Sequence, residues 1–169
     1  VYDSINAALK FGLTPVKLNA VIMEGFNDDE ILDFVQLSIH HALDIRFIEL
    51  MPIGQTSEEN RYRYLSSEDI KKKLPALIPL NKQEGVAELY KYPEGLGTIG
   101  FISPMSNLFC GSCDKIRLTA DGKLKPCLHS DEEIDLRGIL KTGDDELLKE
   151  TIKKAILHKG DKHYLNEGA

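Results

Sequence analysis

Three cysteines with a spacing typical of metal sites lie in one short stretch of this sequence. Cys110 and Cys113 form a C-x2-C step, Cys127 follows after thirteen further residues, and these are all the cysteines in the chain. The two thiolates of a C-x2-C step can bind one metal ion or one iron-sulfur cluster. A third thiolate brought back by a hairpin would complete a three-cysteine site.

The residues between the second and third cysteines predict that hairpin. The segment KIRLTADGKLKP has the pattern of two short strands joined at an Asp-Gly pair, residues 121–122. Aspartate followed by glycine tolerates the positive backbone dihedrals of a tight turn. Lys115 and Arg117 alternate onto one face of the first strand, so they would point two cations at the bound group, as phosphate recognition requires. The alternative is that both charges simply face solvent.

The cysteine spacing is compatible with three kinds of site. A [4Fe-4S] cluster held by three thiolates keeps one iron without a protein ligand. A structural zinc site would add His129 to the three cysteines as a fourth, tetrahedral ligand. A redox dithiol at Cys110 and Cys113 fits less well, because that motif opens a helix after a strand, whereas a strand-like segment follows here. Spacing alone leaves these alternatives open and places zinc slightly ahead of the cluster.

Composition limits the kind of protein that surrounds the cysteines. The 169 residues are 42% hydrophobic and 28% charged, which is typical of a globular chain that buries a core. The formal net charge of -6 argues against binding to nucleic acid or to an anionic membrane. No apolar run approaches the roughly 20 residues that cross a bilayer, and the first residues lack a secretion signal. We therefore expect a cytoplasmic protein that binds neither nucleic acid nor membrane.

The first fifty residues predict parallel β/α construction. Helical segments at 4–11 and 28–42 alternate with strand candidates at 16–23 and 45–51, and the links between them are short. Because such units place ligands at the ends of their strands, polar side chains on these strands are candidates for a binding cavity.

Two strand candidates carry such polar side chains. Lys17 and Asn19 share one face of an otherwise apolar strand, which suggests that this face lines a ligand cavity. The alternative is a lysine that reaches solvent from an edge strand. Arg46 and Glu49 lie on opposite faces of the next strand, and spacing does not decide which of them meets a ligand.

Beyond residue 51 the pattern is less regular. We expect a surface excursion at 52–65, a short helix capped by Ser66 or Ser67, and a hairpin of 86–92 with 97–103. Two helices are predicted at 131–140 and 144–157. The second would present one apolar face, formed by Leu147, Leu148, Ile152, Ala155 and Ile156.

Several segments resemble a known family. FCGSCDKIRLTADGKLKPCL resembles the C-terminal cluster motif of the molybdenum cofactor biosynthesis protein A family, the radical S-adenosylmethionine enzymes that act as GTP 3′,8-cyclases. The resemblance extends, in the family's order, to PVKLNAVIMEGFNDDEILDF, IRFIELMPIG, ISPMSNLFCGSC and KHYLNEG, and so covers nearly the whole chain.

The resemblance implies a fold and an activity. The fold class would be α/β, with residues 1–56 forming the C-terminal strands and helices of an incomplete (β/α)6 TIM-like barrel. Residues 57–169 would form an irregular α+β segment that binds GTP and carries an auxiliary iron-sulfur site. In the family, a radical generated from S-adenosylmethionine removes hydrogen from the ribose of GTP, and the resulting radical attacks the guanine base. The cofactors implied are therefore S-adenosylmethionine and iron-sulfur clusters.

The resemblance also implies roles for individual residues. Cys110, Cys113 and Cys127 match the ligands of the auxiliary [4Fe-4S] cluster, which reverses the preference for zinc. Lys115 departs from the family pattern, because arginine is common there and lysine lacks the planar fork of donors. The positions matching GTP contacts are Lys17, Arg46, Lys115, Ile116 and Arg117, and those matching S-adenosylmethionine contacts are Met51 and Asn19.

One family motif is missing from the chain. The family binds its radical-generating [4Fe-4S] cluster through an N-terminal C-x3-C-x2-C motif, which these 169 residues lack. We therefore expect a partial chain, truncated at both ends, that cannot catalyse alone, with the second cluster in the missing N-terminal half. The implied partners are GTP and a downstream molybdopterin precursor synthase. A barrel with exposed strand edges further predicts a homodimer.

Overall fold

A computed structural model describes residues 1–53, 63–130 and 132–160 of the chain. Two compact units divide between Leu108 and Phe109, and each is described by itself. The boundary predicted at residues 56 and 57 separates functional segments and stays a prediction. Most of the predicted excursion at 52–65 and the tail KHYLNEG lie outside the described residues.

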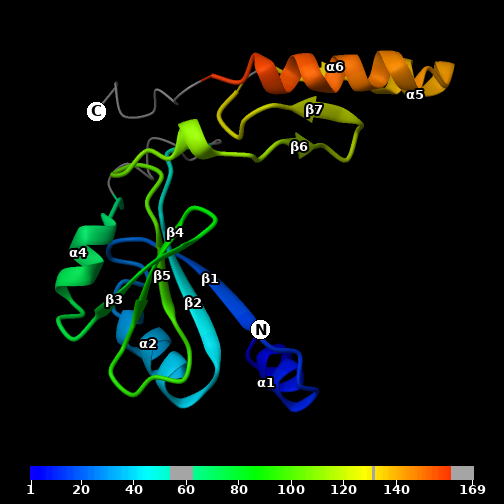
Figure 1. The fold of residues 1–169 in the computed structure, drawn as a ribbon. Coiled ribbons are helices and arrows are strands. Elements are labelled where there is room, and N and C mark those ends of the chain that lie inside the picture. Colours follow the sequence, from blue (N-terminus) through cyan, green and yellow to red (C-terminus); the bar gives the residue numbers. More distant parts are fainter. Residues whose placement is uncertain (54–62, 131, 161–169) are drawn as a thin grey trace. The chain divides into compact units, whose positions relative to one another are not determined.

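The first unit is a mixed five-stranded sheet with helices (Figure 1). The strand order is β1-β2-β5-β4-β3; β1, β2 and β5 run parallel, whereas β4 is antiparallel to both its neighbours. The elements are α1 (Tyr2–Lys10), β1 (Val16–Ile22), α2 (Ile31–His40), β2 (Leu43–Glu49), α4 (Ser67–Lys72), β3 (Ile78–Glu84), β4 (Ala87–Lys91) and β5 (Ile99–Ile102). The predicted helix, strand, helix, strand order of the first fifty residues is confirmed.

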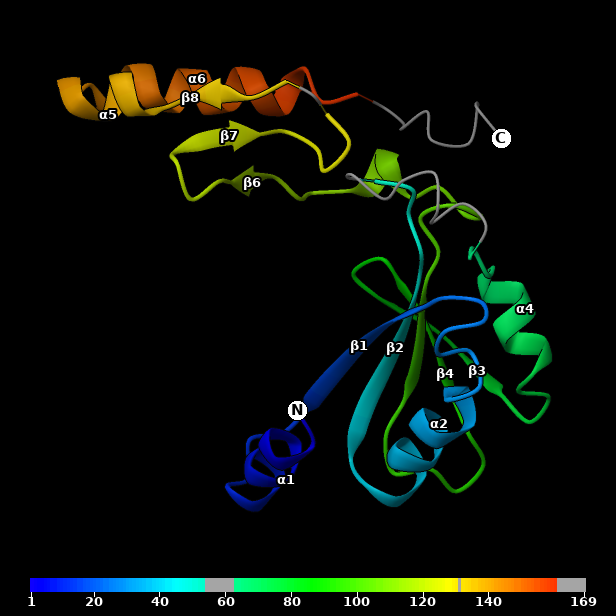
Figure 2. The ribbon, with the colours of Figure 1, turned by 180° about the vertical axis from the view of Figure 1, so that it is seen from behind.

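The core of this unit lies on one face of the sheet. Alternate residues of β2 are fully buried, and the helices α1, α2 and α4 each contribute apolar side chains to the same cluster, so they cover the same face (Figure 2). Each buried aliphatic side chain contributes about 1.5–3 kcal/mol, so this face supplies most of the unit's stability. The fully buried members are Ile22, Ile31, Val35, Leu43, Ile45, Phe47, Ile70, Leu74, Ile99 and Phe101.

One strand of this unit was not predicted. The segment IPLNKQE forms β3, although almost all its residues are exposed and it shows no clear alternation. It is a strand because it pairs with β4, across an irregularity between Pro79 and Gln83. The predicted hairpin of 86–92 with 97–103 is confirmed as the antiparallel pair β4 and β5. Pairing with the next strand in a hairpin therefore overrides the weak strand propensity of β3.

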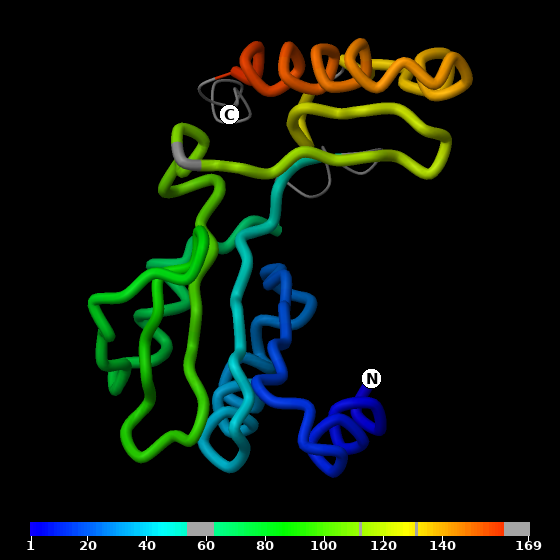
Figure 3. Tube along the Cα trace, turned by 45° about the vertical axis from the view of Figure 1, so that its right-hand side comes forward, coloured from blue at the N-terminus to red at the C-terminus, as the bar shows by residue number. Residues whose placement is uncertain are grey.

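The second unit contains a small antiparallel sheet with helices (Figures 2 and 3). Its core is formed by Leu124, Leu136 and Ala155. None of the helices in the described ranges is long and apolar enough to cross a membrane. The elements are the 3-10 turn η1 (Cys110–Ser112), β6 (Arg117–Leu118), β7 (Lys123–Lys125), β8 (Ile134–Asp135), α5 (Arg137–Thr142) and α6 (Asp145–Leu157).

The hairpin predicted from the cysteine stretch is confirmed as β6 and β7. Its connection is longer than a two-residue turn, since the Gly122 N–H donates to the Thr119 carbonyl at 3.0 Å. Gly122 has a φ of +80°, and a Cβ there would meet Cγ of Arg137 at 2.8 Å. Glycine is therefore required at this position by both backbone conformation and space.

Of the two helices predicted in this unit, one is wrong in part and the other is confirmed with a narrower apolar face. The helix expected at 131–140 is wrong in its first half, because Ile134–Asp135 pairs with β7 and the helix begins only at Arg137. The helix expected at 144–157 is confirmed, with the Asp144 side chain accepting from the Leu147 N–H. Its apolar face is narrower than predicted, since Leu147 and Ile156 are 45% and 48% exposed. A three-stranded sheet covers only a narrow stripe of the helix.

A buried carboxylate connects three segments of the first unit. Glu49, at the end of β2, is 1% exposed. It accepts hydrogen bonds from the Ser67 N–H at 2.8 Å, the Met105 and Ser106 N–H groups at 2.9 Å each, and the Ser106 hydroxyl. Burial, together with the charge of Glu49, raises the pKa of nearby Tyr64 to about 12. Glu49 therefore serves the fold, and of the two candidates on β2 only Arg46 remains for a ligand.

Replacing this carboxylate with its amide should destabilise the first unit. In Glu49→Gln, an NH2 group replaces one oxygen and faces at least two donors, each of which loses its acceptor in a buried site. We expect the free energy of unfolding to fall by about 3 kcal/mol. Urea denaturation followed by circular dichroism measures this change. As a control, Glu68→Gln removes a 69% exposed partner of Lys71 and should cost less than about 1 kcal/mol. Equal losses in the two variants would contradict the role of Glu49.

Candidate functional site

The uncovered face of the first sheet gathers the predicted polar residues of β1 and β2. Lys17 and Asn19 are exposed by strand alternation, as predicted. Asn19 lies opposite Arg46 in the parallel register, so these two side chains share a face. Lys17 and Arg46 retain 31% and 19% exposure of their side chains. The structure therefore brings three of the predicted site residues together on one face of neighbouring strands.

The neighbouring strand β5 makes room for the Arg46 side chain. Arg46 lies opposite Gly100, where a Cβ would stand only 3.2 Å from Cγ of Arg46. The Nε of Arg46 is buried and, within the described ranges, has no hydrogen-bond partner. A buried donor of this kind is costly unless something accepts from it. The Nε of Arg46 therefore keeps an unused hydrogen-bond donor.

A carboxylate of β3 already contacts both cations. Glu84 forms ion pairs with Lys17 and with Arg46, the latter at 2.9 Å. Lys17, and then Arg46, lower the pKa of Glu84 below its ordinary value of 4.5. Sequence reasoning missed Glu84, because it lies 67 residues beyond Lys17 on a strand that was not predicted.

The ion pair between Glu84 and Lys17 shows that the sheet is not flat. β1 and β3 are the two edge strands, four strand spacings apart, which is roughly 19 Å in a flat sheet. An ion pair cannot span that distance, so the hairpin of β3 and β4 folds back over the uncovered face. The irregular pairing between Pro79 and Gln83, with a positive φ of 47° at Asn81, provides the bend.

Met51, predicted to contact S-adenosylmethionine, lies just beyond β2. It is partly buried, follows the buried Leu50, and its carbonyl accepts from the Ile53 N–H at 2.8 Å. The residue is thus placed after the carboxyl end of a parallel strand, where ligands bind in β/α proteins.

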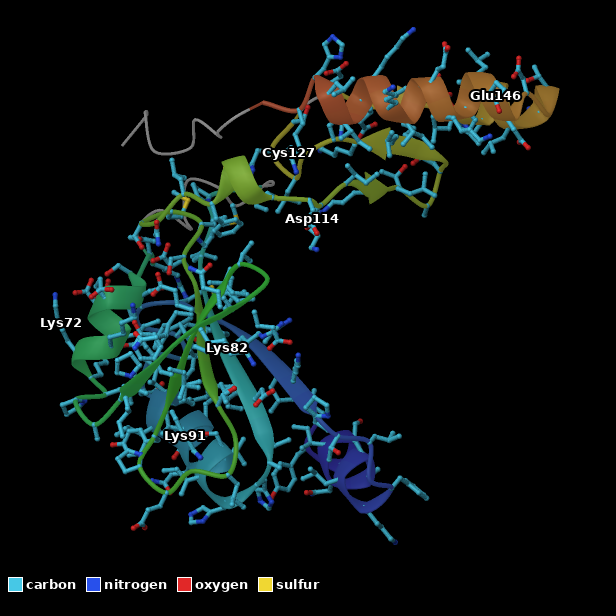
Figure 4. The ribbon with its side chains drawn as sticks, viewed as in Figure 1. Lys72, Lys82, Lys91, Asp114, Cys127 and Glu146 are labelled. Carbon is cyan, nitrogen blue, oxygen red and sulfur yellow. The ribbon has the colours of Figure 1, made fainter. Side chains whose placement is uncertain are left out.

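The three cysteines all lie in the second unit. Cys110 begins the turn η1, and the Cys113 N–H donates to the Cys110 carbonyl at 3.1 Å. Cys127 follows β7, and its Sγ lies 3.5 Å from Nδ1 of His129 (Figure 4). All three are free, partly buried thiols. Within the described part of the chain, no three His, Cys, Asp or Glu side chains gather as a metal-holding group.

A lysine from the far end of this unit contacts the cysteine stretch. The ammonium of Lys159 lies 2.8 Å from the Cys113 carbonyl, 3.2 Å from its Sγ and 2.8 Å from the Lys115 carbonyl. Burial by itself raises the pKa of Cys113, but the Lys115 N–H and the Lys159 ammonium outweigh it, so that the pKa is lowered from its ordinary value of 9.0. The environment of Cys113 therefore favours a thiolate, the form that binds metal.

The hairpin presents cations on its surface. Lys115, Ile116 and Arg117 are exposed, and Lys115 pairs with Asp114 at 2.6 Å on the segment before β6 (Figure 4). Arg117 lies directly opposite Lys125 in the antiparallel register, so two like charges share one face. Such a pair is unfavourable by itself and is stabilised by an anion. The sequence analysis missed Lys125.

A family profile described as Molybdenum Cofactor Synthesis C matches residues 43–165. The chain belongs to this family. Among curated relatives, the GTP 3′,8-cyclase of Alkaliphilus oremlandii is 46% identical over 166 residues, and that of Moorella thermoacetica is 47% identical over 174 residues. These matches cover 98% and 99% of this chain but 52% and 54% of the relatives. The chain thus spans about half the length of the curated relatives it matches, and the predicted resemblance is confirmed.

Removing the internal carboxylate should strengthen anion binding to the first unit. Glu84→Gln leaves Lys17 and Arg46 without their anionic partner, so we expect inorganic tripolyphosphate to bind about fivefold more tightly. Isothermal titration calorimetry at fixed salt measures the change.

The matched control for this experiment is Asp33→Asn. It removes one negative charge from α2, which covers the opposite face of the sheet. A general charge effect would strengthen binding equally in both variants. Unchanged affinity in Glu84→Gln would contradict the role of Lys17 and Arg46 as an anion site.

Proposed function

We propose that this chain is the GTP-binding C-terminal part of a GTP 3′,8-cyclase of molybdenum cofactor biosynthesis. The enzyme would convert GTP to (8S)-3′,8-cyclo-7,8-dihydroguanosine 5′-triphosphate by radical chemistry with S-adenosylmethionine. The observation that carries the proposal is a cysteine-bearing hairpin lined with cations, in a chain whose relatives are GTP 3′,8-cyclases.

The side chains of the second unit fit an iron-sulfur cluster by their chemistry. Cys110, Cys113 and Cys127 are free thiols within one unit, and Cys113 lies in surroundings that favour the thiolate. These three residues would hold an auxiliary [4Fe-4S] cluster, which when bound supplies an iron without a protein ligand for the guanine base.

The cations would bind the rest of the nucleotide. Lys115, Ile116 and Arg117 are exposed on the cysteine-bearing stretch, where the two charged groups can reach a polar ligand. In the first unit, Lys17 and Arg46 would replace their contact with Glu84 by contacts with phosphate oxygens. Arginine suits this exchange, because its fork of donors matches two phosphate oxygens at once. The protein's contribution is to fix the base and the ribose relative to each other.

The remaining assignments concern the barrel and its S-adenosylmethionine site. Residues 1–56 would complete the C-terminal side of an incomplete (β/α)6 barrel, whose parallel strands and one-sided helices match the first unit. Met51 and Asn19 would contact S-adenosylmethionine. The second [4Fe-4S] cluster, which generates the radical, would be bound by a segment that these 169 residues do not contain. The enzyme would act in the cytoplasm as a homodimer. Its product would be the substrate of a downstream molybdopterin precursor synthase.

One contact favours a second candidate function. Cys127 Sγ and His129 Nδ1 lie 3.5 Å apart, and together with Cys110 and Cys113 they would supply the three-cysteine, one-histidine ligand set of a structural zinc site. The chain would then be a non-catalytic, zinc-stabilised binding module. The two candidates differ in metal content and in their response to GTP.

Metal analysis after anaerobic reconstitution distinguishes these functions. The cyclase proposal predicts about four irons and four sulfides per chain, with a brown chromophore whose spectrum changes on addition of GTP. Cys127→Ala should lose the cluster while keeping most of the helical circular dichroism, because α5 and α6 pack without that thiol.

The control is Ser130→Ala, in the same segment but without a thiol, which should load iron like the wild type. One tightly held zinc and no iron in the wild-type chain would overturn the cyclase proposal. Full iron content in Cys127→Ala would show that the third ligand is wrongly assigned.

A further inference from the structure

Lys159, two residues beyond the end of α6, has an ammonium group whose hydrogen bonds all go to the cysteine stretch. The ammonium of Lys159 has three N–H donors, and three acceptors lie within reach: the carbonyls of Cys113 and Lys115 at 2.8 Å each, and the Cys113 Sγ at 3.2 Å. Lys159 is partly buried. By contrast, Lys149 on α6 makes an exposed pair with Glu146, one helical turn away.

We propose that Lys159 is a positioning residue for Cys113, which holds the backbone of residues 113–115 and places a fixed positive charge beside the Cys113 sulfur. The inference rests on the proposed function, in which Cys113 is a ligand of the auxiliary cluster. It adds a residue outside the cysteine motif to that site.

The fold explains why this lysine can hold the loop. α6 is fixed at its N-terminus by the Asp144 cap and along its length by Ala155, which is 3% exposed in the core of the unit. The helix packs against β7, and β7 pairs with β6, which follows the C-x2-C step. Lys159 therefore connects the end of the helix to the segment that enters β6, and closes a ring of contacts through the unit.

The positive charge of Lys159 would partly neutralise the negative charge that the cysteine ligands bring together. Three thiolates bring three negative charges to one place, and Asp114 adds another beside Cys113. Lys115 is a nearby cation, but its ammonium pairs with Asp114 at 2.6 Å. The ammonium of Lys159, in contrast, contacts the Cys113 sulfur directly. A cation there stabilises the reduced, more negative state of a bound cluster.

The first test uses the 169-residue chain in its metal-free form. In Lys159→Met, which keeps the length of the side chain but removes its donors and charge, the amides of residues 113–115 should exchange with deuterium about tenfold faster. Lys159→Arg keeps the donors and the charge, so its exchange rates should remain within about threefold of those of the wild type. Lys153→Met, at an exposed position on α6, is the matched control and should leave the exchange of residues 113–115 unchanged.

The second test uses the reconstituted chain. We expect Lys159→Met to shift the midpoint potential of the cluster to a more negative value and to lose iron to a chelator about tenfold faster, whereas Lys153→Met should do neither. Lys159→Arg should restore the potential toward that of the wild type. If Lys159 only holds the backbone, Lys159→Met should lose iron faster than the wild type but have the same midpoint potential.

The two tests separate failure of this inference from failure of the proposed function. If the wild-type chain binds iron and Lys159→Met matches it in exchange, retention and potential, the role of Lys159 is wrong while the cluster stands. If the wild-type chain binds only zinc, the proposed function is wrong, and with it the role of Lys159 at a cluster. Amide exchange then decides whether Lys159 orders residues 113–115 at all.

Discussion

The first unit depends on one buried charge at the end of β2. Glu49 ends the strand and accepts hydrogen bonds from Ser67 at the start of α4 and from Met105 and Ser106 in the segment after β5. The Ser67 N–H is buried and would otherwise have no acceptor, and the buried carboxylate in turn needs these donors, so the two depend on each other. With Glu49 held on the helix-covered side, the alternate residue Arg46 faces the uncovered side. The separation between the buried face of β2 and the face that carries the candidate residue Arg46 therefore follows from strand alternation anchored at one buried residue.

Much of the architecture follows from local sequence patterns. Alternation in residues 16–22 and apolar periodicity in residues 31–39 predict the strand, the helix and the faces they present, because burial on one side of a sheet imposes those periods. The hairpin after the cysteines is predictable from turn chemistry, and Gly122 shows why glycine is needed there. The resemblance to the cyclase family rests on the same kind of local information, and the family match confirms it.

What the sequence could not provide is the pairing and packing of separate elements. β3 is a strand only through its hairpin partner β4, and residues 134–135 pair with β7 although their composition favours a helix. The partners of the site residues are more remote still, since Lys159 contacts Cys113 across 46 residues. No periodicity encodes such contacts, because they depend on how the elements pack. The cysteines and several cations of the candidate site could therefore be named from the sequence. The residues that contact them, such as Glu84 and Lys159, could not.

If Lys17 and Arg46 bind phosphate as proposed, the β3 and β4 hairpin would make that binding selective. Glu84, tethered beside the two cations, would compete with the ligand at an effective concentration that for a short tether is in the millimolar range. A metabolite with one negative charge interacts with the two cations no more strongly than the Glu84 carboxylate that it must displace. A polyphosphate has several charged oxygens and can bind both cations at once. The hairpin would thereby reject abundant small anions and admit only ligands of high charge density, without any contact to the rest of the ligand.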